Sequence, residues 1–79
     1  MKQAFTTAEV AQLCHVSQAT VNRWLKDRVL RGFRGTERGH WRVFRHHLVS
    51  FMDRRQMPME LLDELDSEIG KRMEVLVGN

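Results

Sequence analysis

Two short helical segments, separated by only three residues, constrain the fold of this chain more than any other feature of its sequence. The first is predicted over residues 5–14, where Thr6 can cap the helix and Glu9, three residues later, can reach back to the Thr6 amide. The second is predicted over residues 18–26, directly behind Ser17, a favoured N-cap residue. This closely connected pair is the centre of the predicted fold.

The second helix has two unlike faces. Val21, Trp24 and Leu25 recur at i, i+3 and i+4, which predicts an apolar face with Trp24 in the core. The remaining positions hold hydrogen-bond donors and acceptors and no acidic residue: Gln18, Thr20, Asn22, Arg23 and Lys26. This composition predicts a face made for polar contacts.

Beyond the second helix the pattern becomes extended. Residues 30–34 and 40–44 each alternate in side-chain type and flank a loop with glycine at both ends, which predicts a β-hairpin. Helical spacing returns in Leu48, Val49, Phe51 and Met52 and is expected to end before Pro58. The predicted fold is mainly α with a small β-hairpin wing, in the order helix, helix, hairpin, helix.

Charge is unevenly distributed along the 79 residues. Residues 1–58 contain 11 Lys and Arg against 4 Asp and Glu, whereas residues 59–79 contain 2 against 6. A basic body followed by an acidic tail indicates a domain that binds a polyanion, with nucleic acid as the leading candidate, and a segment that does not touch it. We therefore predict a binding domain over residues 1–58 and an amphipathic tail over residues 59–79.

The acidic tail carries one apolar stripe at spacings of three and four, formed by Leu62, Leu65, Ile69, Met73 and Leu76. Such a stripe must be covered by the domain, by a second copy or by a region beyond this chain. We favour a C-terminal amphipathic helix that self-associates into a homodimer. The alternative is a strand over residues 71–77, similar to the opening strand of a response-regulator receiver domain, in which case the chain is the N-terminal part of a longer regulator.

Residues 5–57 resemble the MerR-like and excisionase-type DNA-binding domains. The opening Phe5-Thr-Thr-Ala-Glu-Val-Ala is similar to theirs, and Arg38-Gly-His-Trp-Arg-Val-Phe is similar to their wing motif. The apolar helix-turn-helix positions are occupied by Val10, Ala11, Cys14, Val16, Val21 and Trp24. The resemblance implies a winged helix-turn-helix that binds double-stranded DNA.

The chain departs from this family pattern at four positions. His15 stands in the turn where glycine is usual, and histidine tolerates a positive φ better than most residues. Trp41 replaces a second basic residue of the wing, and His46 and His47 replace acidic residues at the start of the next helix. Contacts of the wing are therefore less firmly predicted than those of the second helix.

Major-groove reading needs a helix with donors and acceptors near its N-terminus, and Asn, Gln and Arg can each pair with a base edge. The predicted DNA-binding residues on the second helix are Ser17, Gln18, Thr20, Asn22, Arg23 and Lys26. Those on the wing are Arg34, Arg38, His40 and Arg42. We place Arg38 above Arg42, whose stem can pack on the core. Lys26, Arg28 and Arg31 are candidates for contacts with the DNA backbone beside the groove, and the alternative for each is a solvated side chain.

Other classes of function are disfavoured. No nucleophile and base, paired carboxylates or phosphate-binding glycine loop is visible, so we expect neither an enzyme nor a cofactor. Cys14 is expected in the core rather than in a metal site with His15, His40, His46 or His47. No signal peptide or membrane span is visible, which predicts a cytoplasmic protein.

Transcriptional regulation is the leading predicted role. The alternative is an architectural role, as an excisionase that directs site-specific recombination or as a phage terminase small subunit. A module whose basic face docks an acidic protein is a further alternative, and competitor DNA would not displace its partner.

Overall fold

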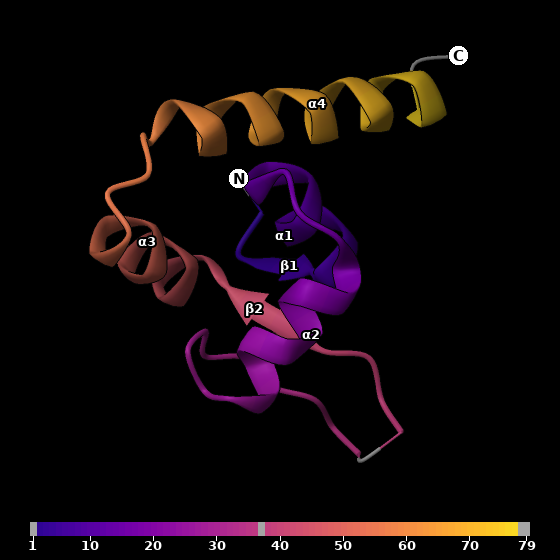
Figure 1. Ribbon diagram of the computed structural model, residues 1–79. Helices are drawn as coiled ribbons and strands as arrows, with labels where there is room; N and C mark the ends of the chain where they lie inside the picture. Colours follow the sequence, from indigo (N-terminus) through magenta and orange to yellow (C-terminus); the bar gives the residue numbers. More distant parts are fainter. Residues whose placement is uncertain (1, 37, 78–79) are drawn as a thin grey trace.

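The computed structural model describes residues 2–36 and 38–77, with side chains as far as residue 72. The described chain is mainly helical and contains a small antiparallel sheet, so the predicted fold class is confirmed (Figure 1). In order, the elements are β1 (Ala4–Thr6), α1 (Thr7–Cys14), α2 (Gln18–Lys26), β2 (Arg42–Phe44), α3 (Arg45–Arg54) and α4 (Glu60–Val77).

The start of α1 is fixed by the predicted capping box. The Glu9 amide donates to the Thr6 hydroxyl at 3.1 Å, and the Thr6 amide donates to a Glu9 carboxylate oxygen at 2.8 Å. Both bonds satisfy amides that lack partners within the helix. The prediction was wrong for Phe5, which lies in β1 because the cap at Thr6 excludes it from the helix.

The turn between α1 and α2 takes the conformation predicted for it. His15 adopts the left-handed conformation, with φ 58° and ψ 42°. The Val16 amide then donates to the Ala11 carbonyl at 3.0 Å, which closes the end of α1 in the manner of a Schellman motif. His15 thus adopts the left-handed conformation for which glycine is usual at this turn, and the chain changes direction there and continues into α2.

The sheet differs from the predicted hairpin. β2 is where a strand was expected, but it pairs along its length with β1, and Phe5 lies opposite Val43. Of the other predicted strand, only Phe33 pairs, through two hydrogen bonds of 2.8 Å with Arg42. The reason is burial: Phe5 and Val43 are both fully buried, whereas Phe33 is 41% exposed. Pairing β2 with β1 therefore contributes more to the core.

The hydrophobic core lies where the helices meet the inner face of the sheet. Phe5, Val10, Val21, Leu48 and Phe51 are among its buried side chains. The predicted helix-turn-helix core is confirmed for its buried members Val10, Ala11 and Val21. The other three, Cys14, Val16 and Trp24, are partly buried against that core. The Trp24 ring packs on Phe51 with centroids 5.1 Å apart.

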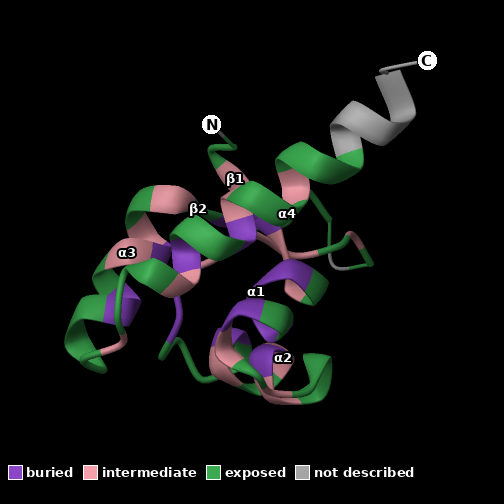
Figure 2. Ribbon diagram, turned by 90° about the horizontal axis from the view of Figure 1, so that it is seen from above, coloured by how far each residue is buried: buried purple, intermediate pink, exposed green. Residues whose placement is uncertain are grey.

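Helix α4 packs on α1, on the side away from α2 (Figure 1). Leu62 and Leu65 are buried in the common core, and Ile69 is partly buried against it. Figure 2 shows buried and intermediate stretches alternating with exposed ones along α4. The first half of the predicted stripe is therefore covered by the chain itself. Because α4 continues to Val77, the alternative of a strand over residues 71–77 is wrong. The remaining stripe residues, Met73 and Leu76, lie outside the described side chains.

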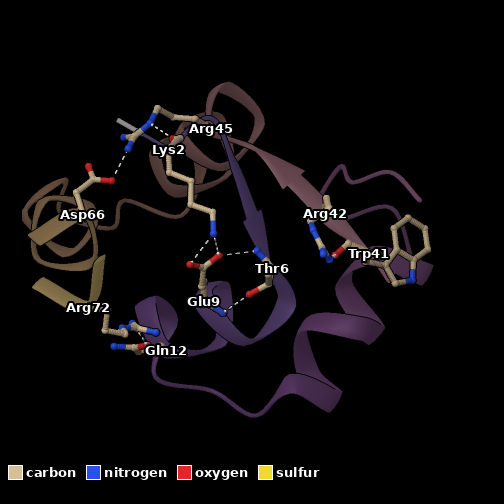
Figure 3. A network of polar contacts seen from close by, with 9 residues as sticks. All are labelled: Lys2, Thr6, Glu9, Gln12, Trp41, Arg42, Arg45, Asp66 and Arg72. Atoms are coloured by element: carbon tan, nitrogen blue, oxygen red, sulfur yellow. Dashed lines mark hydrogen bonds and ion pairs between the residues drawn. The ribbon is translucent and has the colours of Figure 1, made fainter. Parts of the chain in front are cut away.

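Arg45 ties α4 to the N-terminal segment. Its guanidinium forms an ion pair with Asp66 of α4 and donates through Nε to the Lys2 carbonyl at 2.8 Å (Figure 3). The backbone amide of Arg45 also donates to the Gln3 carbonyl at 2.7 Å. One residue at the start of α3 thus connects three parts of the chain.

The Glu9 carboxylate makes stability depend on pH. Burial alone would raise the pKa of Glu9, but hydrogen bonds from the Lys2 ammonium and the Thr6 amide outweigh it and lower the pKa (Figure 3). A lowered pKa in the folded state means that the carboxylate stabilises the fold above its unfolded pKa of about 4.3. This stabilisation is lost as the pH falls through the folded pKa.

Glu9→Gln is expected to lower the free energy of unfolding at pH 7 by about 1 kcal/mol, because the amide keeps an acceptor but loses the charge. Denaturation in urea at pH 7 and at pH 3 measures the effect, which should shrink at the lower pH. Glu68→Gln is the matched control, since it removes the same charge from an exposed position. An equal loss at both pH values would show that the Glu9 charge is unimportant.

Candidate nucleic-acid interface

Two side-chain hydroxyl groups form hydrogen bonds at the N-terminus of α2. The Ser17 side chain accepts from the Thr20 amide at 3.2 Å, which confirms Ser17 as the N-cap. The Ser17 and Thr20 hydroxyls also share a hydrogen bond at 3.0 Å. Ser17 is exposed and Thr20 partly exposed, so both lie at the surface while they fix the direction of the helix.

Gln18, the first residue of α2, is held by α1. The Thr7 hydroxyl donates to the side-chain oxygen Oε1 of Gln18 at 3.3 Å. This contact restrains an otherwise flexible side chain and leaves its NH₂ group as a donor. The sequence did not reveal the role of Thr7, because the two residues meet only once the two helices have packed.

An exposed strip runs along α2 opposite its apolar face. Arg23 and Lys26 are exposed, and Asn22 is partly exposed beside them. Ala19 lies on the same strip, is exposed, and was missed by the sequence prediction. Helical spacing would have found it, since Ala19 is four residues before Arg23. Its small side chain allows close approach, and its methyl group can contact a thymine methyl.

The wing residues do not all occupy equivalent places. Arg34, Arg38 and His40 are exposed in the loop that precedes β2. The Arg34 guanidinium lies 4.6 Å from the centre of the Trp41 ring. Arg42 instead lies in β2, is partly buried, and donates to the Trp41 carbonyl at 3.1 Å (Figure 3). Arg42 is therefore less exposed than Arg38.

The basic and acidic segments are separated in space as well as in sequence. α4 crosses one end of the molecule, and the loop before β2 projects at the other, with α2 nearer to that loop (Figure 1). The exposed acidic residues Asp63, Glu64 and Glu68 belong to α4. An approaching polyanion therefore meets α2 and the wing without facing these carboxylates.

Among the described residues, no three His, Cys, Asp or Glu side chains are grouped as a metal ion would require. The helices that the structure describes are also too short or too polar to cross a membrane. Cys14 lies partly buried against the core, where burial raises the pKa of its thiol.

The fold and the surface together define a winged helix-turn-helix, a class of DNA-binding domain. A family model described as a helix-turn-helix domain matches residues 4–56, and the chain belongs to that family. The family is excisionase-like, so the excisionase-type resemblance is confirmed. No curated protein and no solved structure gave a match.

Proposed function

We propose that this protein binds specific sites on double-stranded DNA and acts in transcriptional regulation. The observation that carries the proposal is the exposed strip of α2, which joins base-reading side chains to basic ones and contains no carboxylate. Asn22 and Gln18 can each pair with adenine, and Arg23 can pair with guanine. Lys26, further along the helix, is suited to a backbone phosphate.

The wing has a different part in this proposal. Arg38 and His40 are exposed on a loop that projects beyond the sheet, where their side chains can reach phosphates beside the groove. Contacts to phosphate fix the position of a protein on DNA without reading its sequence. We therefore assign specificity to α2 and affinity to the wing.

Duplexes selected from a random pool by the wild-type protein provide the site on which to test this division. On the selected duplex, Arg23→Ala is expected to weaken binding by about 1–3 kcal/mol, and by much less on random DNA. Arg38→Ala is the matched control and should weaken both by similar amounts. Fluorescence anisotropy at fixed salt measures both. Equal losses for Arg23→Ala on the two duplexes would reduce Arg23 to a phosphate contact.

An architectural role is the second candidate, and the match to an excisionase-like family favours it. An excisionase or a terminase small subunit would share the fold and the reading helix. The two roles differ in what happens to the DNA, because an architectural protein bends it or loads in several adjacent copies. A bending assay with the selected duplex separates them, since an unbent duplex with one bound unit favours simple regulation.

The homodimer predicted from the C-terminal stripe also belongs to this proposal. Leu62 and Leu65 are already buried in the chain's own core, so self-association has to use other residues of α4. Two related half-sites in the selected duplex, together with a doubled mass in sedimentation, would support a dimer. A single half-site and a monomeric mass would contradict it.

A further inference from the structure

An open groove of about 670 Å³ lies beside the C-terminal end of α2. Its walls come from the segment that follows α2, from the residue before β2 and from α3. The lining residues are Leu25, Arg28, Val29, Leu30, Arg31, Gly32, Trp41, His47, Ser50 and Arg54. Since Leu25 is on the buried side of α2, the groove is distinct from the exposed strip of that helix.

The charge of this groove is entirely positive. Arg28, Arg31 and Arg54 line it, all three are exposed, and no Asp or Glu is among the lining residues. Within residues 2–36 and 38–72, none of the three arginines forms an ion pair. Three guanidinium groups that share one groove repel one another, and an anion bound between them would relieve that repulsion.

His47 also lines the groove. Its Nδ1 is buried and has no hydrogen-bond partner among the described residues. Burial, together with the nearby His46 and Arg31, lowers the pKa of His47, so the ring is neutral near pH 7. A neutral imidazole adds no charge to the groove, and its buried Nδ1 is not accessible to a group bound there, so the positive charge of the groove comes from the arginines.

The aromatic wall of the groove depends on Gly32. A Cβ atom at this position would lie 2.5 Å from the Leu25 side chain and 3.3 Å from the Trp41 ring. Glycine therefore lets the chain pass close to both residues and keeps Trp41 at the edge of the groove. Trp41 provides a spectroscopic probe at the site, because its indole N–H gives a separate NMR signal.

We propose that this groove binds a phosphate group through Arg28, Arg31 and Arg54. The phosphate could come from the backbone of bound DNA or from a free phosphorylated molecule, and guanidinium groups recognise both in the same way. The first source rests on the DNA binding proposed above, whereas the second does not. In either case, the groove extends the binding surface beyond the exposed strip of α2 and the wing.

The test uses the full chain and inorganic phosphate as the probe. Phosphate replaces chloride at constant ionic strength while NMR follows the Trp41 indole N–H and the arginine side-chain signals. Saturable shifts are expected at millimolar phosphate in the wild type. Arg31→Gln and Arg54→Gln should each weaken this binding about tenfold or more, which corresponds to one charge-assisted contact. Lys71→Gln is the control, because it removes one charge from α4, outside the groove.

A second measurement identifies the source of the phosphate. If it belongs to DNA, a duplex displaces inorganic phosphate from the groove, and Arg31→Gln reduces the salt dependence of DNA binding by about one unit of slope. If it belongs to a free molecule, phosphate still binds to the DNA complex and the slope is unchanged.

The proposal is overturned if the wild type shows no saturable shifts with phosphate and if Arg31→Gln matches Lys71→Gln in DNA binding. A failure of the proposed function looks different. In that case duplex DNA does not bind at all, while the phosphate titration still reports on the groove.

Discussion

Leu65→Ala is expected to lower the free energy of unfolding by about 2–5 kcal/mol. Leu65 is only 3% exposed and belongs to the same core as α1, so the substitution leaves a cavity between α4 and the domain. The free energy of unfolding of a domain of this size is small, so the variant should be partly unfolded at 37 °C. Urea denaturation followed by circular dichroism measures the loss.

Met59→Ala is the matched control for Leu65→Ala. Met59 directly precedes α4 but is 39% exposed, so its truncation should change stability by less than about 0.5 kcal/mol. The opposite finding would be a Leu65→Ala chain that is as stable as the wild type but has a smaller mass in sedimentation. That outcome would place the stripe in a dimer interface instead of the core of one chain.

The helix-turn-helix could be predicted from the sequence because its signals are local. Thr6 and Glu9 cap α1, Ser17 caps α2, and His15 turns the chain between them, all within short stretches. Each signal lies within a few residues of the feature that it specifies. The structure confirms every one of them.

The sheet could not be predicted because its partners are far apart in sequence. β1 has three residues, Ala4–Thr6, and is too short to show an alternating pattern. It pairs with β2, although the whole helix-turn-helix lies between the two strands in the sequence. The sequence instead favoured the neighbouring residues 30–34 as the partner of β2. Only the burial of Phe5 against Val43 explains the actual pairing.

The same limit applies to α4. Its apolar stripe is visible as a period, but a period does not say which surface covers it. In the structure, Leu62 and Leu65 meet the core, and Asp66 pairs with Arg45. None of these contacts is local, so the sequence alone favoured a second copy and left the domain itself and a missing region as alternatives.

The candidate site contains both features that local sequence predicts and contacts between segments that are distant in sequence. The exposed residues of α2 follow from helical spacing, and the sequence placed Asn22, Arg23 and Lys26 on one face. The restraint on Gln18 by Thr7 and the groove around His47 each need segments that meet only in the folded chain. Predictions from sequence therefore identified the reading helix, but they identified neither the contact that restrains Gln18 nor the groove beside the helix.

The salt dependence of binding to the selected duplex tests the central claim most directly. Each phosphate that the protein neutralises contributes about −0.9 to the slope of log affinity against log salt. With contacts from α2 and the wing, we expect a slope of roughly −3 to −6 per protomer, or a loss of roughly 60-fold to 4,000-fold between about 50 and 200 mM salt. Fluorescence anisotropy with a labelled duplex measures it. An affinity that stays constant across this range would contradict the assignment of the basic surface to DNA.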